Sequence, residues 1–369
     1  MSARNVVIDN LRGLAMLGVI GIHAGSYVLD SATPWLSLFV LCEILSRYAV
    51  PAFFFISGYG LFLQHPLGRS LDYVHFLQGR FKSVMIPYMV WSAFYLYLWN
   101  FPALSFERWS WPTFVEMLFF GDASYHLYFL IILWWFYVTL PLWRYLVAVL
   151  NRHNLWLGLG ILAALQIRLY WWSDTFWTYP ASLTTHHFLL RLLDERFNYC
   201  PLFYGFVFVA GALAALHTDK FRGVLQKYFG VCLVFFVLAV GILLYKFNFY
   251  YAGGMKLLQI PENLQQLTWE GLLYTVACLI FFSSVLIKLQ GQRLSLLDSL
   301  SRHSYIIYLV HPFFLDGIAS WLKLGGIAYD TVPLPLHYLA VLLCSWLTSL
   351  GITAAAHRFR TVGLLLMGK

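Results

Sequence analysis

Three features of the 369-residue sequence predict an all-α fold, a polytopic integral membrane bundle of about ten transmembrane helices with both termini in the cytoplasm. Hydrophobic residues make up 61% of the chain and charged residues only 11%, against roughly 45–50% and 25% in soluble domains. Long apolar runs recur along the chain, and most of the 24 Lys and Arg residues fall in alternate connecting segments. A chain so poor in charge cannot cover a water-facing surface, which excludes a soluble globular protein, and disorder, collagen and coiled coil are excluded as well.

The apolar runs define the predicted spans. A membrane-spanning helix needs about 20 mainly apolar residues, because the hydrocarbon core is about 30 Å thick and each residue adds about 1.5 Å. Irregular backbone is excluded at that depth, since its unpaired polar groups would lie in lipid. The predicted spans are 13–30, 39–63, 84–101, 126–148, 154–172, 200–217, 229–247, 271–288, 303–323 and 335–356.

The charges set the predicted orientation and exclude other classes of site. Lys and Arg collect on the side of the N-terminus, and the positive-inside rule therefore places both termini in the cytoplasm. No basic run of five residues occurs, so binding of nucleic acid is not indicated. The five cysteines form no C-x-x-C pair and the 12 histidines form no H-x-x-x-H pair, so no metal site is predicted.

The first predicted span carries the most specific pair of polar residues, Arg12 and His23. Eleven helical positions amount to three turns and about 20°, so both side chains share one face, about 16 Å apart. This spacing places Arg12 at the cytoplasmic surface and His23 near mid-membrane, where an imidazole could take a proton from an attacking hydroxyl. Arg12 could hold an anionic donor such as a phosphate. A packing histidine and a snorkelling arginine remain the alternative.

Further polar residues lie within other predicted spans. Glu43 and Arg47 are four residues apart, which is typical either of a pair lining a polar cavity or of a buried ion pair that fixes helix register. Ser57 lies in a small-residue stretch that would let backbones approach closely. His126 opens the fourth span, and His311 in the ninth precedes a proline that frees a carbonyl.

Two cations, Arg80 and Lys82, precede the third span on the cytoplasmic side. They could meet phosphate groups, or could simply follow the positive-inside rule.

Five segments follow one another in a recognisable order along the chain. They are Ile8 to Ala15 leading to His23, Pro51 to Gly58, Arg80 to Tyr88, His126 to Leu130, and Ser304 to Pro312. In this order they resemble the bacterial acyltransferase 3 family of membrane-bound O-acyltransferases, and the likeness covers nearly the whole chain. The first segment matches the family's Arg-x10-His signature, and the branch that the chain most resembles modifies enterobacterial antigen and exopolysaccharides.

The resemblance implies transfer of an acyl group, most simply acetyl, from cytoplasmic acyl-CoA to a hydroxyl of a cell-surface or lipid-linked glycan. Acetyl-CoA would be a co-substrate, with no permanently bound cofactor, and the protein would lie in the bacterial cytoplasmic (inner) membrane as a multi-pass protein. His23 would be catalytic with Arg12 its partner, and Arg12, Arg80 and Lys82 would bind acyl-CoA. Glu43, Arg47, Ser57, His126 and His311 would line the cavity.

The sequence also departs from the family pattern. Ser83 stands where the family often has a second arginine, and we expect one domain over residues 1–369 without the fused extracytoplasmic domain of many members. A transporter or flippase for a glycan or small anion is the alternative function, because helices with buried charge fit transport too. Against it, no broken helices occupy matching positions in two halves of the sequence. A purely structural membrane protein is a third reading, disfavoured by so many buried ionisable groups.

Overall fold

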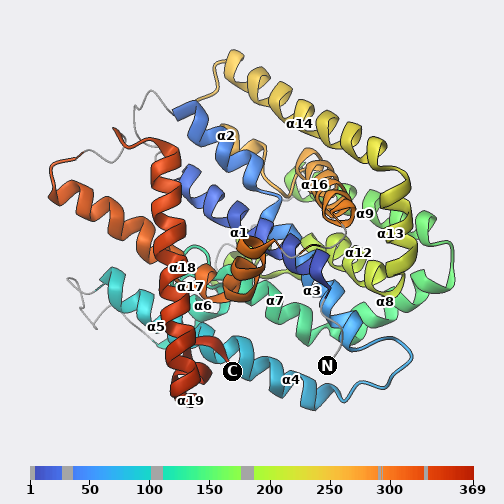
Figure 1. The fold of residues 1–369 in the computed structure, drawn as a ribbon, viewed down its shortest axis with the longest axis horizontal. Helices are drawn as coiled ribbons and strands as arrows, with labels where there is room; N and C mark the ends of the chain where they lie inside the picture. Colours follow the sequence, from blue (N-terminus) through green and yellow to red (C-terminus); the bar gives the residue numbers. More distant parts are fainter. Residues whose placement is uncertain are drawn as a thin grey trace. The chain divides into compact units, whose positions relative to one another are not determined.

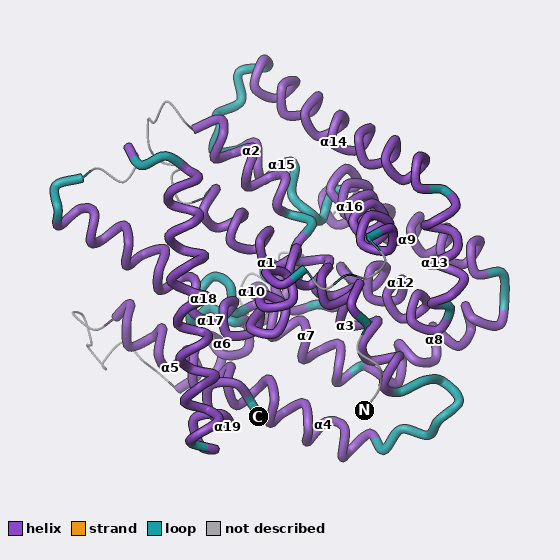
Figure 2. The backbone as a smooth tube through the Cα atoms, in the orientation of Figure 1, coloured by secondary structure: helices purple, strands orange, loops and turns teal. Residues whose placement is uncertain are grey.

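The computed structural model describes residues 5–26, 36–100, 111–175, 187–289, 292, 294–327 and 331–369. In this part of the chain all regular secondary structure is helical and no strand occurs (Figure 2). The predicted all-α class is therefore confirmed. The helices group into two compact units, which are described separately below.

The first unit comprises Met1–Pro66 and Val207–Leu350. The helices of the first unit are α1 (Val6–Ser26), α2 (Leu36–Ser46), α3 (Ala49–Gln64), α12 (Gly205–Leu216), α13 (Thr218–Lys227), α14 (Phe229–Ala252), α15 (Ile260–Asn263), α16 (Trp269–Lys288), α17 (Ser295–Leu324) and α18 (Leu334–Arg358). The last turns of α18, from Gly351, and the first two residues of α12 belong to the second unit. Helix α1 contacts α2, α3, α16 and α17 and so lies at the centre of the first unit, while α14 packs along α16 (Figure 1).

Helix α1 begins at Val6, seven residues earlier than the span predicted from hydropathy. The Asn5 side chain explains this start, because its Oδ1 accepts hydrogen bonds from the backbone nitrogens of Val7 (3.1 Å) and Ile8 (3.4 Å). Such a cap satisfies donors that the first helical turn leaves open. His23 lies in the last turn of the described part of α1, which extends to Ser26.

Glycines allow α1 to pack closely on α2 and α3. Gly18, Gly21 and Gly25 share one face, and a Cβ on Gly25 would lie 2.7 Å from both the Glu43 nitrogen and the Phe39 oxygen. On another face, a Cβ on Gly13 would lie 2.4 Å from the carbonyl oxygen of Leu297 in α17. Small residues are what permit such backbone contacts between membrane helices.

The predicted span 39–63 consists of two helices, α2 and α3, which together still form one candidate span, Leu36–Gln64. A turn at Arg47 and Tyr48 separates them, with the Arg47 nitrogen bonded to the Ile44 oxygen at 3.2 Å. Pro51 accounts for the break, because it has no N–H to offer the carbonyl of residue 47.

Helices α3 and α12 approach each other through two reciprocal glycines. A Cβ on Gly58 would lie 2.1 Å from the Phe208 oxygen, and one on Gly211 would lie 2.0 Å from the Phe55 oxygen. The close approach expected of the Ser57–Gly60 stretch therefore depends on Gly58 alone, since a Cβ on Gly60 would meet nothing within 4 Å.

The second unit comprises Leu67–Phe206 and Gly351–Lys369. Asp72 caps its first helix by accepting a hydrogen bond from the His75 nitrogen at 3.0 Å. Its elements are α4 (Tyr73–Arg80), the π-helical turn η1 (Phe81–Met85), α5 (Ile86–Asn100), α6 (Trp111–Phe120), α7 (Tyr128–Val138), α8 (Leu140–Arg152), α9 (Leu155–Thr175), α10 (His187–Asp194), α11 (Arg196–Tyr199), the 3₁₀ turn η5 (Pro201–Tyr204) and α19 (Arg360–Met367).

Seven helices in the described residues are long and apolar enough to cross a membrane, or nine if each of two bent pairs counts as one span. The pairs are α7 with α8, bent by 67°, and the stretch Pro201–Leu216 with α13, bent by 99°. These nine correspond to nine of the ten predicted spans. The remaining prediction, 84–101, falls on α5, which is described over 15 residues up to Asn100, where this described segment ends. The polytopic membrane class is confirmed. The described part of α5 is shorter than the roughly 20 residues that a membrane span needs.

Candidate functional site

The structure brings two histidines from distant parts of the sequence into contact in the first unit. His23 of α1 and His311 of α17 have ring centroids 5.0 Å apart, with the ring planes inclined by 32°. His311 is fully buried, while His23 keeps part of its surface accessible. Helix α1 packs against α17, which the contact at Gly13 permits, and this packing holds the two histidines together. This pair is the chemical centre of the candidate site.

A backbone hydrogen bond sets the orientation of the His311 ring. Its Nδ1 lies 2.7 Å from the carbonyl oxygen of Tyr308, one turn earlier in α17. A carbonyl oxygen only accepts, so Nδ1 donates, and the neutral ring then carries its lone pair on Nε2. Two adjacent imidazolium charges would repel each other, so one ring of the pair is available to accept a proton.

A polar pair formed by Glu43 of α2 and Arg47 of the turn after it lies at the same level of the unit. Arg47 Nη2 forms an ion pair with Glu43 Oε1, and Arg47 Nη1 is 3.4 Å from Gln266 Oε1. Arg47 also interacts electrostatically with His23. Glu43 is 3% exposed and the Arg47 side chain 17% exposed, so the carboxylate is held away from solvent and is neutralised by the half-buried guanidinium.

Arg12 lies toward the other end of α1. Its Nη1 is 3.9 Å from Asp9 Oδ1, one turn earlier, and its side chain is 34% exposed. Three helical turns, about 16 Å along the axis, separate it from His23 on the same face of α1. The accessible guanidinium can therefore receive an anion at a level well removed from the histidine pair.

Ser57 does not lie near the histidine pair. Helix α1 runs antiparallel to α2 and α3, since Gly25 packs on Glu43 while Asn5 Nδ2 bonds to the Tyr59 hydroxyl at 2.7 Å. Ser57 precedes Tyr59 by two residues and is therefore at the Asn5 end of α1, opposite to His23. The structure thus groups His23, His311, Glu43 and Arg47, and places Ser57 apart from them.

His126 belongs to the second unit and is enclosed there. It is 1% exposed, its Nδ1 is 3.0 Å from the Ser124 hydroxyl, and its ring packs edge-on against Tyr95 of α5 at 5.2 Å. These contacts describe a buried polar cluster beside the start of α7.

Arg80 and Lys82, also in the second unit, point in different directions. The Arg80 guanidinium lies over the rings of Phe76 (5.2 Å) and Tyr137 (5.4 Å), whereas Lys82 is exposed. Two residues along a helix differ by about 200°, which accounts for the divergence. Lys82 and Ser83 lie in the π-helical turn η1, and such turns recur at functional sites.

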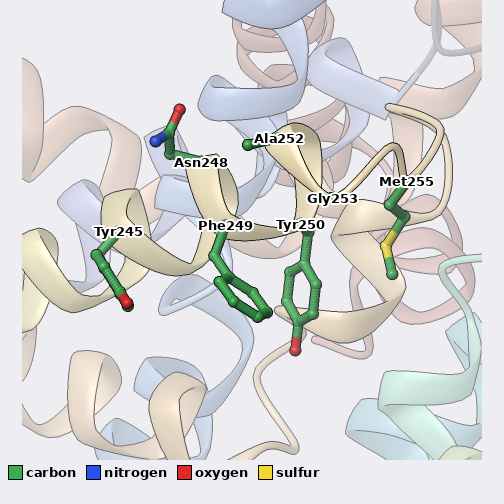
Figure 3. Close-up of a pocket in the computed structure, with 7 residues that line it drawn as sticks. All are labelled: Tyr245, Asn248, Phe249, Tyr250, Ala252, Gly253 and Met255. Atoms are coloured by element: carbon green, nitrogen blue, oxygen red, sulfur yellow. The ribbon is translucent and has the colours of Figure 1, made fainter.

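The aromatic end of α14 borders an open hollow of about 560 Å³. Figure 3 shows the rings of Tyr245, Phe249 and Tyr250 along one side of the helix, with Met255 beside them. Close by, Lys246 Nζ is 3.2 Å from Glu270 Oε1. Within the described residues no group of three His, Cys, Asp or Glu side chains could hold a metal ion.

Comparison with known proteins decides the family. The sequence profile of the family described as "Acyltransferase domain" matches residues 5–354, nearly the whole chain. The chain belongs to the acyltransferase 3 family. Comparisons with curated proteins and with solved structures each found no match. As a member of this family the protein is a membrane acyltransferase, and the family favours this activity over the transporter alternative.

Three contacts of the site in this acyltransferase 3 protein were not predicted from the sequence. They are the contact of His311 with His23, the hydrogen bond of His311 with the Tyr308 carbonyl, and the contact of Gln266 with Arg47. The first and third join segments more than 200 residues apart, which no spacing rule relates. The sequence indicated that the proline after His311 leaves a backbone carbonyl free in this turn. The Tyr308 carbonyl, which accepts the hydrogen bond from His311, lies in the same turn.

Proposed function

We propose that this acyltransferase is an O-acyltransferase that moves an acyl group, most simply acetyl, from cytoplasmic acyl-CoA to a hydroxyl of a cell-surface or lipid-linked glycan. Membership of the acyltransferase 3 family supports acyl transfer. The contact between His23 and His311 carries the chemical part of the proposal, because it provides a base inside a helical bundle. The bacterial cytoplasmic membrane, with both chain termini inside, is the proposed location.

In the proposed reaction His23 is the general base. It takes the proton from the acceptor hydroxyl as the hydroxyl oxygen attacks the thioester carbonyl. The new C–O bond forms and the C–S bond breaks, and CoA leaves as a thiolate that takes up the proton from His23. His311 orients His23, and the Arg47 guanidinium, which acts electrostatically on His23, is suited to stabilise negative charge on the carbonyl oxygen.

The proposed donor residues are Arg12 in the first unit and Arg80 and Lys82 in the second. Each is a cation suited to phosphate groups, of which CoA carries three phosphorus centres as a diphosphate and a monophosphate. Arg12 lies about 16 Å from His23 along α1, a span that the extended arm of CoA can cover while its phosphates stay near the guanidinium. His126 is kept as a proposed cavity residue of the second unit.

The proposal is tested by acyl-CoA turnover with protein purified in lipid nanodiscs, supplied with labelled acetyl-CoA and a panel of glycan extracts. We expect His23→Ala to lower transfer by about 10²–10⁴-fold, the contribution typical of a general base. Arg12→Ala should raise the KM for acetyl-CoA through loss of a phosphate contact. Gel filtration checks that each variant is folded.

Two matched controls are built into the chain. His303 lies on α17, eight residues from His311 and so about 12 Å away along the helix. Arg302 forms an ion pair with Asp298 at 3.0 Å, much as Arg12 does with Asp9. His303→Ala and Arg302→Ala should keep wild-type turnover. Transfer that survives in folded His23→Ala protein would remove the catalytic assignment.

A further inference from the structure

Glu43 on α2 and Arg47 in the turn that follows it have hydrogen-bonding capacity that the described residues do not use. Glu43 Oε1 is paired with Arg47 Nη2, but Glu43 Oε2 is buried without a hydrogen-bond partner among the described residues. The same holds for Arg47 Nε, which is also buried. A carboxylate oxygen and a guanidinium nitrogen enclosed in this way are costly to leave unsatisfied.

The two open atoms require opposite partners. Arg47 Nε–H is a donor and needs an acceptor, whereas the ionised Glu43 Oε2 is an acceptor and needs a donor. An anion such as a phosphate could accept from Arg47 but would be repelled by Glu43. An ammonium group could donate to Glu43 but could not accept. A hydroxyl does both at once.

The pair lies close to the catalytic level of the unit. The backbones of α1 and α2 meet where Gly25 faces the Glu43 nitrogen, and His23 precedes Gly25 by two residues, about 3 Å along the axis. Arg47 in turn acts electrostatically on His23. A hydroxyl held by Glu43 and Arg47 would therefore lie at the same level along the α1 axis as a hydroxyl presented to His23.

We infer that Glu43 and Arg47 bind a second hydroxyl of the acceptor, beside the one that is acylated, so that the acceptor is an uncharged diol of the kind found on a neutral sugar ring. This inference rests on the proposed O-acyl transfer and specifies its substrate class. Gln266 also contacts this guanidinium, with its Oε1 3.4 Å from Arg47 Nη1. Glu43 and Arg47 thus determine which acceptors the enzyme prefers.

The test compares two alcohols of the same ring size, cis-1,2-cyclohexanediol and cyclohexanol, as acceptors for labelled acetyl-CoA with protein in nanodiscs. The readout is the ratio of the two transfer rates, measured within each variant. For the wild type we expect the diol to be favoured by about 10–100-fold, the range of one or two hydrogen bonds to charged groups. In Glu43→Gln the ratio should fall to within about threefold of unity.

Two further variants separate the inference from a general loss of structure. Arg47→Lys keeps the positive charge opposite Glu43 but lacks the Nε–H donor, so its ratio should fall as well. Glu270→Gln alters another buried carboxylate of the same unit, the one paired with Lys246, and should keep the wild-type ratio. A ratio is independent of how much protein is folded.

Equal use of the two alcohols by the wild type would overturn the inference, and so would a wild-type ratio in both Glu43→Gln and Arg47→Lys. Either result leaves the proposed O-acyl transfer standing. Failure of the wild type to consume acyl-CoA with any glycan or alcohol would instead contradict the proposed function itself.

Discussion

At the scale of single residues, the contact between His23 and His311 gives a membrane-embedded imidazole a fixed partner. A lone histidine between helices is costly in lipid and can rotate about its side-chain bonds. Here the Tyr308 carbonyl fixes one tautomer of His311, and the His311 ring packs against His23. In the proposed reaction His311 therefore has a positioning role, distinct from the proton transfer proposed for His23.

His311→Ala tests this division. We expect the rate of acyl transfer to fall by about 10–100-fold, a part of the roughly 10²–10⁴-fold that a general base supplies. The KM for acetyl-CoA should stay unchanged, because His311 does not contact acetyl-CoA in the proposed reaction. The midpoint of the pH–rate profile should move, since the group that faces His23 has been removed. His303→Ala serves as the control on the same helix.

A merely structural role for His311 predicts a different result. Loss of packing alone would lower the yield of folded protein, while the pH–rate profile of the folded fraction would keep its wild-type midpoint. That outcome would contradict the positioning role.

At the scale of elements, glycines decide how closely the helices of the first unit pack. The reciprocal contacts of Gly58 with the Phe208 oxygen and of Gly211 with the Phe55 oxygen lock α3 against α12. Because the opposing atoms are backbone oxygens, they cannot move aside as a side-chain end could. The site depends on this packing indirectly, since α3 continues from α2, which carries Glu43.

Gly58→Ala and Gly60→Ala form a matched pair two residues apart on α3. A Cβ at position 58 would lie 2.1 Å from the Phe208 oxygen, so we expect the first change to destabilise the protein by about 1–3 kcal/mol. Gly60 has open space around it, and alanine there should be neutral or stabilising by up to about 1 kcal/mol. Thermal unfolding in nanodiscs, followed by gel filtration, measures both. Equal melting temperatures for the two variants would show that α3 and α12 are not in contact at Gly58.

At the scale of the whole molecule, the all-α membrane class could be predicted because apolar segment length reflects bilayer thickness directly. Hydropathy does not register a cap such as Asn5, and it therefore placed the start of the first span too late. It also cannot give the alignment of antiparallel helices, which separates Ser57 from His23 and brings His311 to it. The candidate site residues could be identified one by one from the sequence. Which of them lie together depends on packing between distant segments of the chain.

The number of spans connects α5 to the orientation of the termini. An even number of spans places both termini on one side of the membrane, and an odd number places them on opposite sides. Among the described residues nine spans are long enough when each bent pair counts as one, so the predicted cytoplasmic position of both termini requires α5 as the tenth. Helix α5 alone is about 22 Å long, but it continues directly from η1, and together they run from Phe81 to Asn100.

Cysteine labelling on either side of α5 tests the complete topology. In a background without the five native cysteines, Val74→Cys on α4 should resist a membrane-impermeant maleimide added to intact cells, and Thr113→Cys on α6 should react. Both positions are exposed in the second unit, so a lack of labelling reports the side of the membrane rather than burial. Lys227→Cys on α13 should be protected, and Glu262→Cys on α15 should react, because α14 crosses between them. If Val74→Cys and Thr113→Cys behave alike, α5 does not cross, the spans number nine, and one terminus must lie outside.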